Sequence, residues 1–194
     1  TKRSCDLGGN ALVQPILEMQ GIQKYFPGVH ALDDCRFELR AGEVHALVGE
    51  NGAGKSTLMK ILSGIYPRDG GSVRLDGREI NVKSTLEAQR LGISIIHQEI
   101  NLMQDLTVSE NIYIGREPMQ GILLNGAKQD AQTNALLDSL RLTDIRAGTR
   151  VRTLTVAKQQ MVEIAKALSF SNTRILIMDE PTAALTESEI EDLF

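Results

Sequence analysis

The sequence contains few cysteines, no long apolar run and no surplus of positive charge. Its two cysteines, Cys5 and Cys35, have neither the spacing of a metal site nor the even-numbered framework of a disulfide-rich secreted protein, so a reducing cytosol suits the chain best. No apolar run approaches the roughly 18 residues needed to span a bilayer, and the N-terminus lacks the charged-then-apolar pattern of a signal peptide. Any role at a membrane would therefore depend on a partner.

The charge balance argues against nucleic acid as a partner. Lysine and arginine number 21 against 25 aspartates and glutamates, which gives a net charge of −4. Proteins that bind nucleic acid usually carry a basic surplus or a basic stripe. Small anionic ligands are not excluded, because backbone dipoles can bind them. The 194 residues, 42% of them apolar, suffice for one soluble domain or for most of a larger one.

Strand and helix patterns alternate along the chain. From Ile16 to Gly49 short apolar runs separated by turn signals indicate strands, and KSTLMKILSG then has the period of a helix. Asp76-Gly77 indicates a hairpin, a helix is expected over about 84–91, and ISIIHQ and RILIMDEP read as buried strands. This order is typical of an α/β fold with an antiparallel N-terminal β region.

The stretch between the two buried strands reads as mainly helical. Thr107 and Glu110 are in capping-box register at a helix start, and residues 128–142 are amphipathic without a strand signal. We therefore expect one partial domain over 1–194. Its core segments would cover 15–98 and 171–194, and its helical subdomain would cover about 99–170.

The stretch GENGAGKST, from Gly49 to Thr57, matches the phosphate-loop pattern of glycine, four residues, glycine, lysine and then serine or threonine. The apolar run from Val44 to Val48 precedes it as a predicted strand, and a helical pattern follows. Glycines let the backbone wrap phosphates, and the N–H groups of a helix start supply a positive field. Lys55 would contact phosphate oxygens and Ser56 would coordinate Mg²⁺. The alternative is an ordinary glycine turn with a solvated lysine.

A second strand ends in two adjacent carboxylates. ILIMDE places Asp179 and Glu180 directly after a buried apolar run. In a nucleotide site Asp179 would hold the Mg²⁺ shell and Glu180 would polarise the attacking water. Alone, such residues are more often helix caps or solvated loop charges. Combined with a phosphate loop they favour a nucleoside triphosphatase.

Two more side chains are candidates for the same site. Phe26 lies at a strand end before the phosphate loop, where an aromatic ring could stack on adenine; Tyr25 is the rival, and core packing is the alternative for both. Gln98 follows the strand ISIIH. A glutamine there could reach metal and water, although by itself it is only a surface amide.

The stretch LTVAKQQMVEIAKALS, from Leu154 to Ser169, has two interpretations. Its apolar residues recur at helical spacing, as on any helix that buries one stripe; they are Met161, Ile164, Ala165 and Leu168. Thr155 is also a natural N-cap, and the next backbone N–H groups would then form a site for phosphate. The sixteen residues alone do not decide between the two.

Together these motifs resemble the ATP-binding cassette ATPases. The phosphate loop, Gln98, LTVAKQQMVEIAKAL, ILIMDEP and AALT occur in the order and relative placement of that family. More narrowly, LVGENGAGKSTLMKILSGIYPRDGG, IIHQEINLMQDLTVSENIYIGRE and MVEIAKALS resemble the ATPase subunits of bacterial importers of the ribose, galactose and xylose type. The resemblance covers nearly the whole chain from about Ile16 onward.

The resemblance implies a phosphate-loop nucleoside triphosphatase core in which two cassettes clamp two ATP molecules, each with Mg²⁺. The residues expected to bind this cassette's own ATP are Phe26, Gly49, Asn51, Gly52, Ala53, Gly54, Lys55, Ser56 and Thr57. Gln98 and Glu180 take the catalytic roles, and Ser56, Gln98 and Asp179 hold the metal. The signature residues Thr155, Ala157 and Lys158 would face the other cassette's ATP, and 184–186 resembles the loop that contacts that cassette.

The chain departs from the family pattern at the signature. The usual Leu-Ser-Gly-Gly-Gln is replaced by Leu-Thr-Val-Ala-Lys, so Val156 and Ala157 place carbon where glycine normally lets the backbone approach phosphate. Lys158 lies in the first helical turn, where the helix dipole disfavours a cation by about 0.3–1 kcal/mol. A bound phosphate would offset that, so we hypothesise that Lys158 adds charge where glycine contacts are lost.

The family's switch histidine is absent, because His30, His45 and His97 all precede Asp179. We therefore expect a fragment with an incomplete core that hydrolyses little ATP alone, and a second cassette fused beyond it in the full-length chain.

The leading function is the ATPase that powers monosaccharide import. It would act on the cytoplasmic face of the bacterial inner membrane, with permease subunits and, indirectly, a periplasmic sugar-binding protein. The alternatives are a soluble cassette ATPase acting on ribosomes or DNA, and a regulatory cassette that binds ATP without cleaving it.

Overall fold

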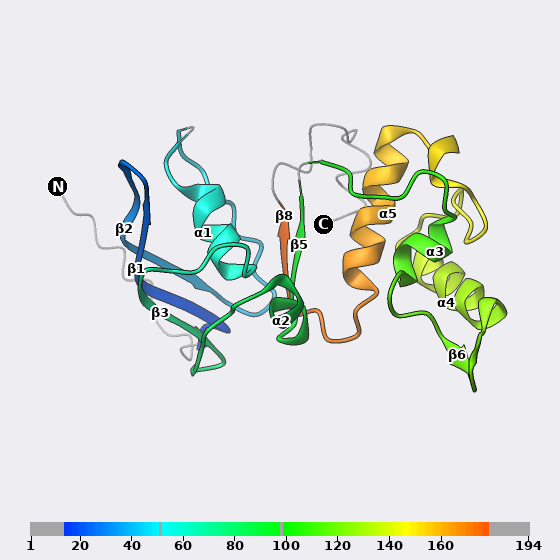
Figure 1. Ribbon diagram of the computed structural model, residues 1–194, viewed down its shortest axis with the longest axis horizontal. Helices are drawn as coiled ribbons and strands as arrows, with labels where there is room; N and C mark the ends of the chain where they lie inside the picture. Colours follow the sequence, from blue (N-terminus) through cyan, green and yellow to red (C-terminus); the bar gives the residue numbers. More distant parts are fainter. Residues whose placement is uncertain (1–13, 51, 98, 179–194) are drawn as a thin grey trace, which may run out of the picture. The chain divides into compact units, whose positions relative to one another are not determined.

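The computed structural model describes residues 14–50, 52–97 and 99–178, and their contacts divide the chain into one unit up to Thr85 and another from Leu86. In chain order the elements are β1 (Leu17–Phe26), β2 (Val29–Leu39), α1 (Lys55–Leu62), β3 (Gly70–Leu75), β4 (Arg78–Ile80), α2 (Thr85–Arg90), β5 (Ile93–Ile96), α3 (Val108–Tyr113), β6 (Met119–Gln120), β7 (Leu123–Leu124), α4 (Gly126–Ser139), the 3₁₀ turn η1 (Val151–Thr153), α5 (Val156–Leu168) and β8 (Ile175–Met178). Figure 1 shows β1 to β3 with α1 in the first unit, and β5, β8 and the remaining long helices in the second. The domain boundaries expected from the sequence stay predictions.

The first unit is built on an antiparallel sheet with the strand order β2-β1-β3-β4. Along β1, Leu17 and Met19 are buried, and the alternation then slips by one residue so that Ile22 and Lys24 are buried next. The slip coincides with irregular pairing around Gly21, which adopts a φ of 62°. A bulge of this kind turns the following side chains to the other face of the strand.

Turn chemistry closes the hairpins as the sequence predicts. Pro27 and Gly28 join β1 to β2, with Gly28 at a φ of 77°, which suits position i+2 of a type II turn. Asp76 and Gly77 join β3 to β4 and both have positive φ. The helix α1 then buries Leu58, Ile61 and Leu62, the spacing of one helical face.

The strand predicted over Val44 to Val48 is wrong for the described structure. This segment pairs with no strand among the described residues, and Val44 and Val48 are 75% and 92% exposed. The apolar run has strand composition, but a β-strand also needs a neighbour for its backbone N–H and C=O groups. Composition alone did not reveal that Val44 to Val48 has no strand partner among the described residues.

In the second unit, β5 and β8 form a parallel pair, with Ile93 opposite Ile175 and Ile96 opposite Met178. Both predicted buried strands are thus confirmed over these residues. Helix α5 lies between this pair and the helices α3 and α4 (Figure 1). It packs into two apolar clusters, one with Ile96 through Met161 and Ile164, and the other with the α3 and α4 core.

The helical stretch follows the sequence expectation except for one short hairpin. The Thr107 hydroxyl accepts a hydrogen bond from the Glu110 N–H, and the Glu110 carboxylate accepts one from the Thr107 N–H, which confirms the capping box. Helix α4 occupies most of the amphipathic stretch predicted over 128–142. The two-residue strands β6 and β7 were not predicted, and Ile122 at their turn is 93% exposed.

Candidate nucleotide-binding site

The predicted phosphate loop leads directly into α1. Gly54 is the N-cap residue, with a φ of 85° and a ψ of 2°, and its carbonyl accepts the first helical hydrogen bond, from Leu58 N–H at 2.9 Å. Within the loop, Ala53 N–H donates to the Glu50 carbonyl at 3.1 Å. The first N–H groups of a helix have no intrahelical acceptors and form its positive end. The loop therefore presents backbone donors where the sequence predicts phosphate.

Two glycines of this loop differ in what surrounds them. A Cβ on Gly54 would lie 2.5 Å from Leu32 Cδ2 and 2.9 Å from the Ala31 carbonyl oxygen, so the β2 strand itself excludes a side chain there. Gly52 has a similar φ of 86°, but a Cβ there would meet no atom of the described residues within 4 Å. Gly54 is thus required by packing and conformation together, whereas Gly52 is required by conformation and leaves open space beside the loop.

Lys55 folds back over the loop. Its Nζ donates to the carbonyl oxygens of Gly49 at 2.7 Å and Glu50 at 2.9 Å. An ammonium group has three donors, so it can hold the loop in shape while it remains within reach of an anion. Ser56 is exposed and Thr57 is half-buried. An exposed loop with a cation and a helix start fits a polyphosphate group, and its serine fits a Mg²⁺ ligand.

The two candidate aromatic residues have different neighbours. Phe26 is half-buried and meets the Tyr66 ring edge-on, with centroids 5.3 Å apart. Tyr25 is exposed and stacks on the His30 ring, with centroids 4.2 Å apart. Neither ring is buried in the apolar core. Both rings stay candidates for contact with a base. Phe26 is held by the Tyr66 ring and Tyr25 by the His30 ring.

The signature stretch combines both of its interpretations. Met161, Ile164 and Ala165 are buried, as the helical stripe predicts, and Leu168 is half-buried. Thr155 is the N-cap of α5, and its hydroxyl accepts a hydrogen bond from Lys158 N–H at 3.4 Å. The stretch is therefore a core helix whose capped N-terminus remains accessible.

Side chains crowd this helix start as the sequence predicts. Val156 is 59% exposed and Ala157 is half-buried, so carbon atoms occupy the face that glycine would leave bare. Lys158 Nζ lies 2.5 Å from Asp144 Oδ2. This hydrogen-bonded ion pair holds the pKa of Asp144 below its usual range. The Lys158 ammonium is engaged by a carboxylate, which a phosphate would have to displace.

Several predicted site residues lie outside the described residues: Asn51, Gln98, Asp179, Glu180 and the stretch 184–186. Of the three expected Mg²⁺ ligands, the structure describes Ser56. Among the described residues no group of three or more His, Cys, Asp and Glu side chains could hold a metal ion. The structure brings the phosphate-loop residues together in the first unit, and it places Thr155, Ala157 and Lys158 together in the second.

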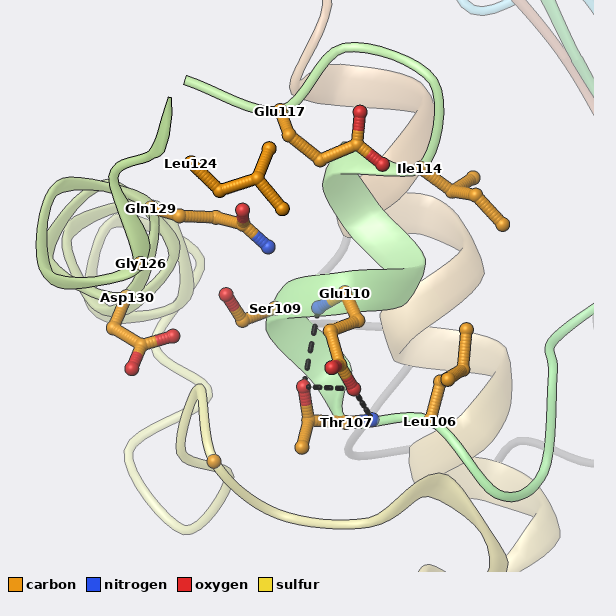
Figure 2. Close-up of a pocket in the computed structure, with 11 residues that line it drawn as sticks. Leu106, Thr107, Ser109, Glu110, Ile114, Glu117, Leu124, Gly126, Gln129 and Asp130 are labelled. Atoms are coloured by element: carbon orange, nitrogen blue, oxygen red, sulfur yellow. Dashed lines mark hydrogen bonds between the residues drawn. The ribbon is translucent and has the colours of Figure 1, made fainter. Parts of the chain in front are cut away.

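A separate hollow of about 450 Å³ lies on the helical part of the second unit (Figure 2). It is lined by Leu106, Thr107, Ser109, Glu110, Ile114, Glu117, Leu124, Gly126, Gln129, Asp130 and Gly148. The lining includes three carboxylates and no cationic side chain, and none of the predicted site residues contributes to it. The buried Ser109 hydroxyl has no hydrogen-bond partner within 14–50, 52–97 and 99–178. Sequence reasoning missed this hollow, because its lining residues come from α3, β7, α4 and the loops beside them.

Two ion pairs that involve neighbours of predicted site residues, or such residues themselves, also escaped sequence reasoning, one in each unit. Lys24 pairs with Asp69, and Lys158 pairs with Asp144. The partners are 45 and 14 positions apart, and no motif or helical spacing links them. For Lys24, the glycine at position 21 was the available signal, since an isolated glycine in a strand pattern indicates a bulge.

Comparison with solved structures places the fold. A nucleotide-free ATP-binding cassette from an ABC transporter matches with a TM-score of 0.79 and 27% identity, over 93% of this chain and 74% of that one. A second cassette, in its ADP conformation, matches with the same TM-score and 28% identity. The fold is that of an ATP-binding cassette, with the mixed α/β core and antiparallel N-terminal sheet that the sequence predicts.

The chain belongs to the ABC transporter family, whose family model matches residues 32–183. It is 59% identical over 191 residues to the putative ribose/galactose/methyl galactoside import ATP-binding protein 2 of Burkholderia cenocepacia. It is 57% identical over 184 residues to the ribose import ATP-binding protein RbsA 1 of Rubrobacter xylanophilus. These matches cover 97% and 94% of this chain, which spans 37% and 36% of the length of those relatives.

Proposed function

We propose that this chain is a nucleotide-binding cassette that binds ATP with Mg²⁺ and hydrolyses it to power import of a monosaccharide through a permease. The observation that carries the proposal is the phosphate loop. Lys55 and the α1 start flank an exposed backbone turn, and among the described residues the space beside Gly52 is open to a polyphosphate. Ribose and galactose are the proposed sugar class, because both named relatives are import proteins for such sugars.

Different residues of the chain have different proposed roles in binding and hydrolysis of ATP. Lys55 and the amides of the loop bind the terminal phosphates, and Phe26 contacts the base. Ser56, Asp179 and Gln98 are the proposed Mg²⁺ ligands, and the metal would neutralise charge on the phosphates. Glu180 orients and deprotonates the attacking water. Thr155, Ala157 and Lys158 contact the ATP of a second cassette.

The proposed partners are a second cassette, a permease and, indirectly, a periplasmic sugar-binding protein. No helix formed by residues 14–50, 52–97 and 99–178 is long and apolar enough to cross a bilayer. We place the cassette at the cytoplasmic face of the inner membrane, where the permease would bind it. We propose that the residues after Gln98 contact the permease. The residues that line the hollow between α3 and α4 all belong to this part of the sequence.

The test uses the full-length protein with its permease and binding protein in proteoliposomes. Lys55→Ala should abolish both ATP hydrolysis and uptake of labelled ribose or galactose, because the terminal phosphates lose their cation. Arg78→Ala, which removes an exposed cation of β4 in the same unit, should leave both unchanged. Wild-type hydrolysis by Lys55→Ala would refute the site. Hydrolysis without sugar uptake, together with co-purification on ribosomes, would favour the soluble cassette alternative.

A further inference from the structure

Lys24 is a buried lysine next to the proposed base-binding residue. Its side chain is only 9% exposed, although lysine is almost never buried without a partner. The bulge at Gly21 accounts for the burial, because it shifts the alternation of β1 and turns Lys24 toward the core face. A charge in such a place needs compensation. The structure supplies it through Asp69, whose Oδ1 lies 3.1 Å from Lys24 Nζ.

Asp69 connects this lysine to the end of β1. Its second carboxylate oxygen accepts a hydrogen bond from Tyr25 N–H at 2.7 Å, and its own N–H donates to the Gln23 carbonyl at 3.0 Å. The Tyr25 N–H, and after it Lys24, keep the pKa of Asp69 below its usual range. The carboxylate therefore fixes both the ammonium and the backbone immediately before Phe26.

The ammonium also faces the Phe26 ring. Lys24 Nζ lies over that ring, 5.4 Å from its centroid, which is within cation–π range. The Tyr66 ring meets Phe26 edge-on, at an interplanar angle of 75°. Tyr66 is joined to α1 through Lys60, whose carbonyl accepts the Tyr66 N–H and whose ammonium lies 5.9 Å from the Tyr66 ring. Contacts thus run from Phe26 to the helix that begins at the phosphate loop.

We propose that Lys24, held by Asp69, is a positioning residue for the purine base of the bound nucleotide. It fixes the tilt of Phe26 and occupies one side of its ring, so that the base stacks on the remaining surface at a set distance from the phosphate loop. Lys24 acts through Phe26 and makes no contact with the phosphates. The inference rests on the proposed function, because it assumes that Phe26 contacts a base.

A purely structural role is the competing explanation. A buried ion pair is weak support for stability, and an apolar side chain of similar volume often replaces one without loss. Lys24→Met keeps the volume. It also leaves no isolated buried charge, since the Asp69 side chain is 35% exposed and keeps its bond from the Tyr25 N–H. This variant therefore removes the cation over Phe26 while the fold is expected to persist.

The experiment measures binding of two ligands to the full-length protein in Mg²⁺ by calorimetry: ATP and inorganic triphosphate, which has no base. Lys24→Met should weaken ATP binding about three- to tenfold, which corresponds to about 0.7–1.4 kcal/mol of binding free energy, and leave triphosphate binding unchanged. Lys24→Arg should retain ATP affinity. In a Phe26→Ala background Lys24→Met should have no further effect, because the ring through which it acts is gone.

The outcomes separate the two proposals. Equal weakening of ATP and triphosphate by Lys24→Met, or no change in either, would overturn the positioning role while the proposed function stands. A wild-type protein that binds neither ligand would overturn the proposed function, and the positioning role with it. An additive effect of Lys24→Met in the Phe26→Ala background would also contradict the inference.

Discussion

Replacing Gly54 by alanine tests whether the phosphate loop is held by the packing described above. Both Gly52 and Gly54 have a φ near 85°, a conformation that costs a residue with a Cβ about 1–2 kcal/mol. At Gly52 the new methyl group would meet no atom of the part of the chain that the structure describes within 4 Å, so Gly52→Ala is expected to lower the free energy of unfolding by about that amount. Gly52→Ala is therefore the matched control.

At Gly54 a second contribution is added. The methyl group would lie 2.5 Å from Leu32 Cδ2 and 2.9 Å from the Ala31 carbonyl oxygen. The leucine can rotate, but the carbonyl belongs to the sheet and cannot move alone. Overpacking of this kind typically costs about 1–3 kcal/mol, which brings the expected loss for Gly54→Ala to about 2–5 kcal/mol.

The assay is urea unfolding of the nucleotide-free protein, followed by circular dichroism. Gly54→Ala should unfold at a clearly lower urea concentration than Gly52→Ala, with a similar dependence on urea. Equal losses for the two variants would refute the reasoning, because they would show that the loop does not lie against β2 as described.

Three further outcomes are expected. Thr107→Ala should lower the free energy of unfolding by about 1 kcal/mol in urea at pH 7, because α3 loses its side-chain cap. The Thr107 N–H holds the pKa of Glu110 below its usual 4.5, so the stabilisation by Glu110 is present above pH 4.5 and is lost as the pH falls below it. The Glu110→Gln variant should therefore lose less stability on acidification than the wild type. An equal loss of stability in the two proteins would contradict this. Lys158→Gln in the full-length protein should weaken ATP-dependent pairing of the cassettes, measured by cross-linking, whereas Asp144→Asn, which frees the ammonium, should not; unchanged pairing in both would leave Lys158 as a surface charge.

Features set by neighbouring residues were predictable from the sequence. The capping box of Thr107 and Glu110, the Thr155 cap and the Asp76-Gly77 hairpin all depend on residues within three positions of one another, and all are present. The core stripe of α5 was predicted in part. Val162 is fully buried but lies outside the predicted stripe, because α5 packs on two sides and so buries a wider surface.

Features that depend on distant partners were not predictable. Val44 to Val48 has strand composition, yet whether a strand forms depends on a neighbouring strand that the sequence does not indicate. Lys24 reads as one polar residue in an alternating run until the bulge at Gly21 reverses its face. Asp69 and Asp144 became visible as partners of lysines only in three dimensions. For the site, the phosphate loop followed from its motif, whereas its electrostatic surroundings did not.

The double packing of α5 limits how this helix can respond when something binds at Thr155. One flank touches Met178 and Leu176 of β8, and the other touches the cluster around Val108 and Ile112. Since close-packed interiors compress little, a push at the capped end cannot be absorbed by bending a single flank. A displacement of the first turn of α5 would therefore move the helix as a rigid body along its axis. The C-terminal end near Leu168 would be displaced with it.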